Sequence, residues 1–195
     1  MSYSYDFHVH TSRYSTCSHS PPEAMCQKAL GVGLAGIALT EHDRWWPVPE
    51  IEALQKQFPD LVILQGVEFS CPEGHFLVFI PDSISNKGLD PNPIKDLIRR
   101  VHRLGGIVIW VHPFRYDRSI PTWIGGVLLD SIEVASTNMD GEASSLAIEI
   151  ARAHGIARLE NSDAHVADSI GMYKNKSPYH LGNNADLIEY VRKAH

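Results

Sequence analysis

The sequence predicts a mixed α/β fold in the form of a compact barrel with about seven mostly parallel strands. Short apolar runs alternate with segments of helical periodicity, which is the pattern of strands joined by crossover helices. The chain has 195 residues, whereas a complete eight-stranded barrel typically needs about 250. The sequence contains no internal repeat and no linker-like segment, so one domain over residues 1–195 is expected.

The predicted strands are short runs, most of them rich in Val, Ile, Leu and Phe. Such runs are typical of parallel strands that are buried on both faces. The strands are expected over residues 2–10, 35–40, 61–68, 75–80, 107–112, 128–134 and 156–162. The segments 71–74, 81–93 and 166–182 are expected to be irregular loops.

Proline and glycine mark several ends of the predicted helices. Pro22 stands at the start of the first helix, and glycines follow the ends of three helices, at Gly31, Gly105 and Gly155. The helices are expected over residues 22–30, 49–58, 93–104, 142–154 and 184–195.

Charge, cysteine content and hydropathy restrict the class of protein. A net charge of −6 argues against binding a nucleic-acid polymer by neutralising its backbone. The three cysteines (Cys17, Cys26 and Cys71) lack paired spacing, which indicates a reducing compartment and no disulfide framework. No apolar run reaches the roughly 20 residues of a membrane span, and residues 1–10 do not resemble a secretion signal. A cytoplasmic protein without a membrane partner is therefore expected.

Histidines and carboxylates stand at the C-terminal ends of the predicted strands. In a parallel barrel these ends converge on one face, and residues i and i+2 of a strand point to the same side. His75 instead opens a strand, and it reaches this face if that strand runs antiparallel to the preceding one. The eight candidate ligands are His8, His10, His42, Glu68, His75, His112, Asp163 and His165.

Such a cluster is costly to bury unless a cation organises it. Imidazoles and carboxylates that share one cavity are partly desolvated and repel one another in some protonation states. Mixed nitrogen and oxygen ligands suit Zn, Mn or Fe better than Ca. Eight candidates exceed the ligands of one tetrahedral ion, so two or three divalent metal ions with a bridging carboxylate are expected.

Five motifs in fixed order resemble those of the polymerase and histidinol phosphatase (PHP) domain family. They are HVHT at 8–11, TEHD at 40–43, GVEFS at 66–70 with His75 following, HPF at 112–114 and SDAH at 162–165. The resemblance implies a distorted seven-stranded (β/α) barrel, similar to a TIM barrel, with two or three metal ions. It carries the metal-ligand role over to the same eight residues, with Glu68 as the bridging carboxylate.

The chain departs from the family pattern in two places. Many members have an Asp or His a few residues after the first motif, and residues 12–19 contain no Asp. His19 is the candidate for this ligand, and water or Cys17 is the alternative. The chain also lacks room for the large inserted cap of some relatives, so a more open cleft is expected.

The resemblance implies hydrolysis of a phosphate ester by a metal-activated hydroxide. No GxSxG-type nucleophile motif is present, in agreement with attack by water. Glu68 and Asp163 are the expected catalytic carboxylates, and Arg115 is the first candidate for binding the phosphate. Further basic residues in loops at the same face are Arg13, Arg44, Arg118, Lys174 and Lys176. The expected substrate is a small phosphorylated metabolite or nucleotide.

Several other residues are assigned supporting roles. Carboxylates that accept a hydrogen bond from the far ring nitrogen commonly orient ligand imidazoles, and Asp6, Glu41 and Asp43 are candidates for this role. Glu133 ends a predicted strand and is a candidate ninth site residue, although an ordinary structural role is favoured. The four tryptophans are expected mostly to pack in the core.

Two other functions fit parts of the pattern. A metal-dependent amidohydrolase acting on C–N bonds usually has a longer barrel and often a metal-bridging lysine at a strand end, and no such lysine is present. A non-catalytic, metal-stabilised binding module would be expected to have lost ligands, whereas this set is nearly complete.

Overall fold

The computed structural model describes residues 2–84 and 88–194 and has a mixed α/β fold. Its strands are β1 (Tyr3–Val9), β2 (Gly36–Leu39), β3 (Val62–Gln65), β4 (Val67–Cys71), β5 (Gly74–Phe79), β6 (Ile107–Val111), β7 (Ser131–Ala135), β8 (Ala157–Glu160) and β9 (Asn175–Ser177). Its helices are α1 (Pro22–Gly31), α2 (Val48–Gln57), α3 (Ile94–Arg103), α4 (Gly141–His154) and α5 (Asn184–Lys193), with short 3-10 turns η1 (Ile124–Gly126) and η2 (Ala167–Ser169).

The described residues form two sheets rather than one closed barrel. One sheet has the strand order β3-β2-β1-β9, and the other has the order β4-β5-β6-β7-β8. Two isolated parallel bridges, His42 to Glu68 and Val9 to Ala164, join the sheets. The mixed α/β class is confirmed, whereas the TIM-like barrel is not found, because these bridges are too short to extend either sheet around the core.

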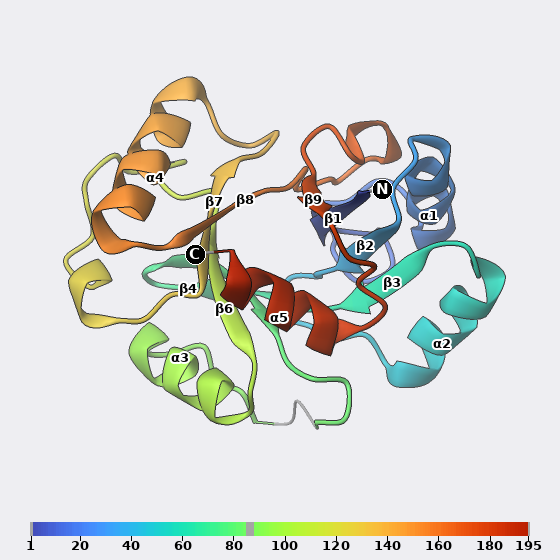
Figure 1. Ribbon diagram of the computed structural model, residues 1–195, viewed down its shortest axis with the longest axis horizontal. Coiled ribbons are helices and arrows are strands. Elements are labelled where there is room, and N and C mark those ends of the chain that lie inside the picture. The colour runs from blue at the N-terminus through green and yellow to red at the C-terminus, as the bar shows by residue number, and fades with distance from the viewer. Residues whose placement is uncertain (1, 85–87, 195) are drawn as a thin grey trace.

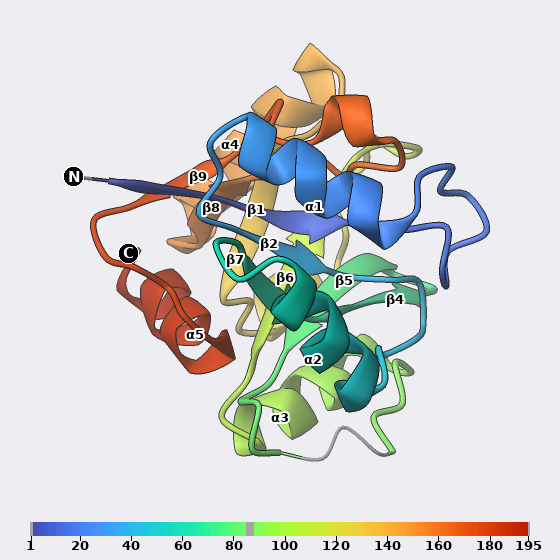
Figure 2. The same cartoon turned by 90° about the vertical axis from the view of Figure 1, so that its right-hand side faces the viewer.

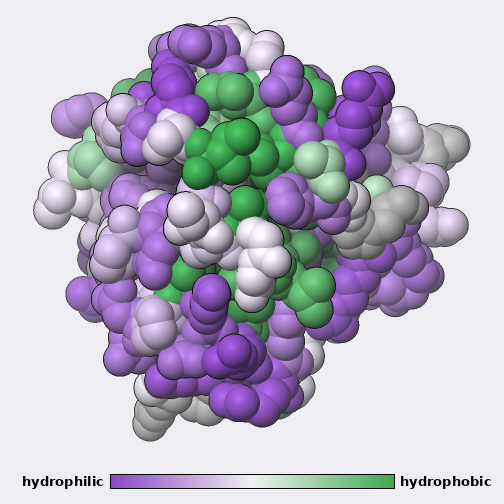
Figure 3. Space-filling model, turned by 90° about the vertical axis from the view of Figure 1, so that its left-hand side faces the viewer, coloured by the Kyte–Doolittle hydropathy of each residue, from purple (hydrophilic) through white to green (hydrophobic). Residues whose placement is uncertain are grey.

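Helices cover the outer faces of both sheets. Figures 1 and 2 show α1 and α2 against the four-stranded sheet, and Figure 1 shows α3 and α4 beside the five-stranded sheet. On the side where α3 and α4 lie, hydrophobic surface runs through the middle of the face with hydrophilic side chains around it (Figure 3). No helix in the described part of the chain is both long enough and apolar enough to cross a membrane. The expected cytoplasmic location stays a prediction.

Helix α5 packs into the space between the sheets. Its buried hydrophobic residues share one core cluster with Phe7 of β1 and Leu77 of β5, so α5 contacts strands of both sheets. The buried hydrophobic residues of α5 in this cluster are Leu187, Ile188 and Val191. Each such side chain stabilises the fold by about 1.5–3 kcal/mol through burial alone. The expected end of this helix at His195 lies outside the described residues.

Replacing Leu187 with Ala should therefore weaken the junction of the two sheets. The side chain is fully buried, and a Leu→Ala change in a core costs about 3 kcal/mol through lost burial and a residual cavity. Urea unfolding would measure the loss. Leu128→Ala, at a residue that is 79% exposed, is the control and should change the unfolding free energy by less than about 0.5 kcal/mol. Equal losses in both variants would contradict the role given to α5.

The single strand expected over residues 61–68 is two strands in different sheets. The apolar run continues across Gly66, but the chain passes there from β3 to β4. A Cβ at Gly66 would lie 2.5 Å from the ring of Phe79, so only glycine allows this close approach. The segment 166–182, expected to be a loop, also contains the short strand β9, which pairs antiparallel with β1.

Strand β5 fulfils the condition set for His75. It runs antiparallel to both β4 and β6, and His75 stands opposite Ser70 of β4 and Val111 of β6. The start of β5 therefore lies at the same end of the sheet as His112, which directly follows β6.

Candidate metal centre

The site lies where the two sheets meet. Two backbone bridges join the sheets. One pairs the candidate ligands His42 and Glu68, and the other pairs Val9 with Ala164, which are both sequence neighbours of candidate ligands. Backbone hydrogen bonds from His10 to Ala164 (2.9 Å) and from Glu68 to Glu41 (3.0 Å) fix these contacts. The junction therefore brings together ligands that are far apart in the sequence.

His8 and His10 lie at the end of β1 on the same side of the strand, as their spacing predicts. Both side chains are fully buried, and their Nε2 atoms are 3.0 Å apart. The ring of His10 also stacks against that of His42 and against that of His165, with a centroid distance of 4.4 Å in each case. Four imidazoles thus belong to one continuous cluster.

Glu68, in β4, is the centre of the cluster. Its Oε1 is hydrogen-bonded to His75 Nδ1 and His112 Nε2, each at 2.9 Å. Its Oε2 lies 3.0 Å from His10 Nε2, 3.1 Å from His42 Nδ1 and 3.3 Å from His8 Nε2. One fully buried carboxylate therefore contacts five imidazoles.

Asp163 approaches the same histidines from the other side. Its Oδ1 lies 3.2 Å from His8 Nε2 and 3.3 Å from His10 Nε2, while its Oδ2 accepts a hydrogen bond from Asn138 Nδ2 at 2.6 Å. His165 Nδ1 is 3.6 Å from Asp163 Oδ1. Asp163 and His112 have positive φ angles of 49° and 29°, a backbone conformation that is uncommon for residues other than glycine and is often found at functional sites.

The arrangement fits cations. Glu68 Oε2 and Asp163 Oδ1 are buried and have no hydrogen-bond partner within the described residues, although imidazole nitrogens lie about 3 Å away. Buried polar atoms normally have such partners. Imidazole nitrogens and carboxylate oxygens are the atoms that bind Zn and similar divalent ions in proteins. Three groups have donor atoms within 4.8 Å of one another and could each hold an ion: His10, His42 and His165; His8, His10, Glu68 and Asp163; and His42, Glu68 and His75.

Charge within the cluster favours deprotonated ligands at several positions. Burial alone would raise the pKa of Glu68, but the imidazoles of His8 and His10 outweigh it and hold the pKa well below its usual range. The pKa of Asp163 is lowered for the same reason, against burial. Burial, opposed only in part by Glu68, lowers the pKa of His42 to about 4. Burial also lowers the pKa of His165. These groups therefore offer free lone pairs at neutral pH.

His8 and His10 are the exceptions, because nearby carboxylates raise the pKa of both imidazoles against the effect of burial. Burial would lower the pKa of His8, but the carboxylates of Asp163, Glu68 and Glu133 raise the pKa well above its usual value. Without a cation, a protonated His8 therefore compensates part of the negative charge. A bound cation would take over this compensation and release the proton.

Glu133 supports two ligands and is the main residue that the sequence interpretation undervalued. It is fully buried in β7; its Oε1 lies 3.2 Å from His8 Nδ1, and its Oε2 accepts a hydrogen bond from the backbone N–H of His112 at 2.9 Å. Asn161 Nδ2 donates to Oε1 at 2.9 Å. The only sequence signal was its place at a strand end. A carboxylate on the far nitrogen of a ligand histidine fixes the orientation of the ring.

The other three expected supporting carboxylates act less directly. Glu41 accepts a hydrogen bond from Ser15 Oγ, which lies 3.3 Å from His10 Nδ1, so Glu41 reaches a ligand through one hydroxyl. Asp43 accepts a hydrogen bond from the backbone N–H of Ser70 at 2.9 Å. Asp6 also binds backbone N–H groups, chiefly that of Ser162 at 3.0 Å. Asp6 and Asp43 thus position backbone segments rather than imidazole rings.

Replacing Glu133 with Gln should weaken metal binding without removing a ligand. Gln cannot supply both charge and two acceptor oxygens, so His8 and the backbone at His112 lose part of their support. Loss of such a partner typically lowers metal affinity about 10- to 100-fold. Competition with a chromogenic chelator would measure the affinity. Glu149→Gln, at an exposed position of α4, should leave it unchanged, and an unchanged affinity in the Glu133 variant would refute the supporting role.

The structure separates His19 from the eight clustered ligand candidates. His19 is exposed, and it belongs to none of the three donor groups. Its backbone N–H donates to the carbonyl of His165 at 2.9 Å, so it ties the loop after β1 to the SDAH segment. A ligand role for His19 stays a prediction that this geometry does not support.

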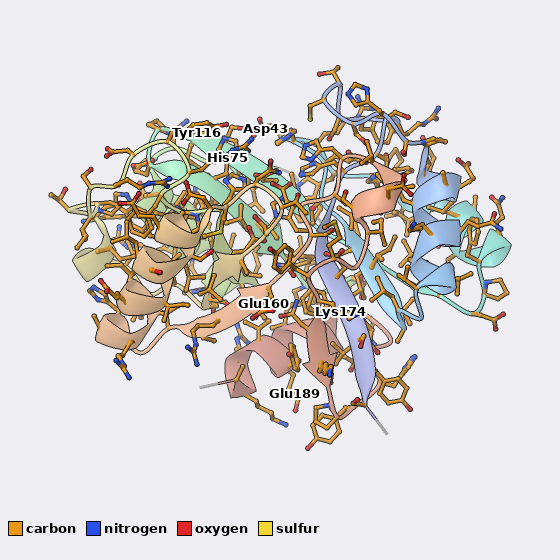
Figure 4. The ribbon with its side chains drawn as sticks, turned by 90° about the horizontal axis from the view of Figure 1, so that it is seen from above. Asp43, His75, Tyr116, Glu160, Lys174 and Glu189 are labelled. Atoms are coloured by element: carbon orange, nitrogen blue, oxygen red, sulfur yellow. The ribbon has the colours of Figure 1, made fainter. Side chains whose placement is uncertain are left out.

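A cleft of about 490 Å³ lies over the cluster, and Arg115 is at its wall. Its lining includes His42, His75, His112 and Asp163. Other basic residues are engaged elsewhere: Arg13 pairs with Glu50 at 2.9 Å, Arg44 lies 4.0 Å from the Tyr14 ring centroid, and Arg118 pairs with Asp140 at 2.6 Å. Figure 4 shows Lys174 away from the edge that carries Asp43, His75 and Tyr116.

The fold and the cluster define an α/β protein with a buried histidine–carboxylate metal centre. The sequence model of the PHP domain matches residues 6–170, and the chain therefore belongs to the PHP domain family. The matched range contains all eight clustered residues. A comparison with curated proteins finds no match.

Solved structures share this fold at low sequence identity. A two-domain protein from Bacteroides vulgatus, described as containing a predicted PHP-like metal-dependent phosphoesterase, is 21% identical with a TM-score of 0.68; the match covers 86% of this chain but 53% of that one. A putative metal-dependent phosphoesterase from Bifidobacterium adolescentis is 16% identical with a TM-score of 0.64, covering 95% and 94% of the two chains. An amidohydrolase from Chromobacterium violaceum, with bound sulfate, is 16% identical with a TM-score of 0.69, covering 96% of each.

Proposed function

We propose that this protein is a metal-dependent hydrolase of phosphate esters that uses two or three divalent ions, with Zn, Mn or Fe as the candidates. The observation that carries the proposal is the pair of buried carboxylate oxygens, one on Glu68 and one on Asp163, that face imidazole nitrogens without a hydrogen bond. Family membership supports the class of metal-dependent hydrolase. A small phosphorylated metabolite or nucleotide is the proposed substrate.

Each part of the site has a distinct role in this reaction. The donor groups that share His10, His42 and Glu68 would hold the ions, with Glu68 as the bridging carboxylate. Bound ions lower the pKa of water and stabilise the charge that develops on the phosphoryl oxygens. Glu133 and Ser15 hold His8 and His10 in place through their Nδ1 atoms. Burial of His8, His10 and Glu68 keeps bulk water from competing for their donor atoms.

Arg115 is the proposed phosphate-binding side chain. It is exposed at the wall of the cleft, beside Asn138 and Thr137, which offer further polar contacts. A guanidinium matches the geometry of a phosphate group and retains its charge at all relevant pH values.

Arg115→Ala should raise the Michaelis constant for a phosphate ester about 10- to 100-fold, because a charge-assisted hydrogen bond contributes about 1.5–3 kcal/mol. Turnover at saturation should fall less. Arg118→Ala, whose guanidinium is already paired with Asp140 and Glu142, serves as the matched control. Steady-state kinetics of both variants with the same ester would measure this effect. Identical Michaelis constants in the wild type and the Arg115 variant would show that Arg115 does not bind the phosphate.

A metal-dependent amidohydrolase is the second candidate. The name of the Chromobacterium violaceum protein favours it. Against it, no lysine is among the described residues that line the cleft over the cluster, whereas a bridging lysine is common in that class. A third possibility, a metal-stabilised binding module without catalysis, agrees less well with a set of eight clustered donors.

One panel separates the three functions. The purified protein would be assayed with Mn or Zn against p-nitrophenyl phosphate, bis-p-nitrophenyl phosphate and an amide library. Hydrolysis of a phosphate ester that chelator abolishes would support the proposal. Activity confined to amides would select the second candidate. A protein that binds metal tightly but hydrolyses nothing would select the third.

A further inference from the structure

A second pocket opens directly beside the metal centre. It has a volume of about 660 Å³, and four aromatic side chains are among the residues that line it. We call it the aromatic pocket, defined by Trp110, Phe114, Tyr116 and Trp123. The cleft over the cluster and the aromatic pocket share four lining residues, His75, His112, Arg115 and Tyr116. A ligand held at the cluster can therefore extend into the aromatic pocket without leaving the protein surface.

The aromatic rings are held firmly against one another. Trp110 and Trp123 pack with ring centroids 5.0 Å apart at 67°, and Trp110 and Phe114 pack at 5.3 Å and 59°. Edge-to-face and tilted contacts of this kind are favourable for aromatic pairs. Trp110 and Trp123 therefore combine the packing role expected of the tryptophans with the lining of a pocket.

Tyr116, at the rim of the aromatic pocket, is exposed to solvent, in contrast to the packed rings of Trp110 and Phe114. It is 83% exposed, and within the described residues its ring is contacted by the Arg115 guanidinium at 5.0 Å from the centroid. Figure 4 shows Tyr116 next to His75 at the same edge of the molecule. Burying a large exposed aromatic ring under a ligand ring would remove apolar surface from water and gain a stacking contact.

A single turn connects the aromatic pocket to the metal centre. His112, which contacts Glu68 at 2.9 Å, and Phe114, which is 4% exposed in the wall, are two residues apart. Both have positive φ angles, 29° and 62°. Non-glycine residues in this conformation are strained and persist where the surroundings hold them in place. The turn therefore sets the distance between the cluster and the aromatic wall.

We propose that the aromatic pocket receives the leaving group of the phosphate ester and that this group carries a flat aromatic ring. The inference rests on the proposed function and names its substrate class. In the reaction, the oxygen of water bonds to phosphorus, the bond between phosphorus and the leaving-group oxygen breaks, and the alcohol departs with a proton from that water. The phosphate stays at the cluster and Arg115, and the ring lies against Tyr116 and the pocket wall.

The first test measures binding and needs no turnover. The probes are 3-phenylpropylphosphonate and 3-cyclohexylpropylphosphonate, which differ in the flatness of the ring and cannot be hydrolysed at the C–P bond. Calorimetric titration of the protein, with and without Mn, should show that the phenyl compound binds about 3- to 10-fold more tightly, the range expected for an aromatic contact. Equal affinity for the two compounds would overturn the proposal.

Variants at two exposed tyrosines show which residue causes the preference for the phenyl compound. Tyr116→Ala should abolish the preference for the phenyl compound, and Tyr116→Phe should retain it. Tyr179, which is 68% exposed and lines a different pocket near α5, provides the control, and Tyr179→Ala should keep the full preference. Because any disturbance of Arg115 would weaken both phosphonates equally, the ratio of affinities reports the ring contact alone. An unchanged ratio in Tyr116→Ala would show that the ring binds elsewhere and would overturn the proposal.

Hydrolysis provides the second measurement. Phosphate release from 2-phenylethyl phosphate and 2-cyclohexylethyl phosphate would be compared, since their leaving groups have similar chemistry. The phenyl ester should have the higher kcat/KM by a similar factor, through a lower KM. If neither ester nor any other phosphate ester is hydrolysed, the proposed function fails, and the binding ratio still decides whether the pocket takes a flat ring.

Discussion

Glu68→Gln is expected to lower metal affinity and phosphate-ester hydrolysis by about three orders of magnitude. Removing one partner of a buried charge network costs about 3–5 kcal/mol, which corresponds to this range. The carboxylate of Glu68 contacts five imidazoles. Within the described chain, Glu68 is also the one residue shared by the donor group that contains His8 and the donor group that contains His75. In the variant, one acceptor oxygen becomes an NH₂ group whose hydrogens point toward the place of the ions.

Two measurements check this expectation independently. Metal affinity follows from competition with a chelator, and hydrolysis follows from phosphate release. Metal should also stabilise the wild type by about 2.7 kcal/mol at a concentration one hundred times its dissociation constant, whereas the variant should gain almost nothing at that concentration. Glu52→Gln, at an exposed position of α2, should behave as the wild type. Full metal-dependent stabilisation of Glu68→Gln would show that the ions are held without this residue.

Features that depend on local periodicity could be predicted from the sequence. His8 and His10 occupy one side of β1 because residues two apart in a strand share a face, and the structure places both in the cluster. Asp163 and His165 also lie close together, but both follow the end of β8 at Glu160, so strand periodicity does not account for their contact. The five helices were also predictable, because proline and glycine mark several of their ends and their apolar positions recur with helical spacing.

Features that depend on contacts between distant segments could not be predicted. The run 61–68 has one continuous apolar pattern, yet the ring of Phe79 forces a close approach at Gly66 and the chain changes sheets there. Glu133 resembles an ordinary strand residue in the sequence. Its hydrogen bonds to His112 and Asn161 exist because β7 lies between β6 and β8 in the sheet, and the sequence of β7 alone does not show this order. Strand pairing of this kind is not encoded in the spacing of one segment.

The two-sheet arrangement has a consequence for how the site is held. A closed barrel would fix the ligand strands by continuous hydrogen bonding around the ring. Here the candidate ligands lie at a junction of two sheets that is joined by two isolated bridges. Side chains that hydrogen-bond from one sheet to the other therefore contribute more to positioning the candidate ligands than they would in a closed barrel. Asp6 of β1 is such a residue, since it binds the segment that follows β8 and carries Asp163.

Asp6→Ala is accordingly expected to destabilise the metal-free protein by about 4 kcal/mol. The carboxylate is fully buried and accepts hydrogen bonds from the backbone N–H and the hydroxyl of Ser162 and from the backbone N–H of Gly171. Each donor left without a partner costs about 1–3 kcal/mol. Removing a buried carboxyl group recovers part of its desolvation cost, which makes the net loss smaller than the sum of the three.

Urea unfolding of the metal-free protein would measure this loss apart from metal binding. Asp168→Ala is the matched control, because Asp168 stands nearby in η2 but its side chain is 95% exposed and contacts only Lys28 at 3.1 Å among the ion pairs of the described chain. It should change the unfolding free energy by less than about 0.5 kcal/mol. Asp6→Asn keeps an acceptor oxygen for one backbone donor and should lose roughly half as much as Asp6→Ala. If Asp6→Ala loses no more than its control, the Val9–Ala164 bridge and the hydrogen bonds to the backbone of Ser162 and His165 hold the SDAH segment, and the junction does not need the buried carboxylate.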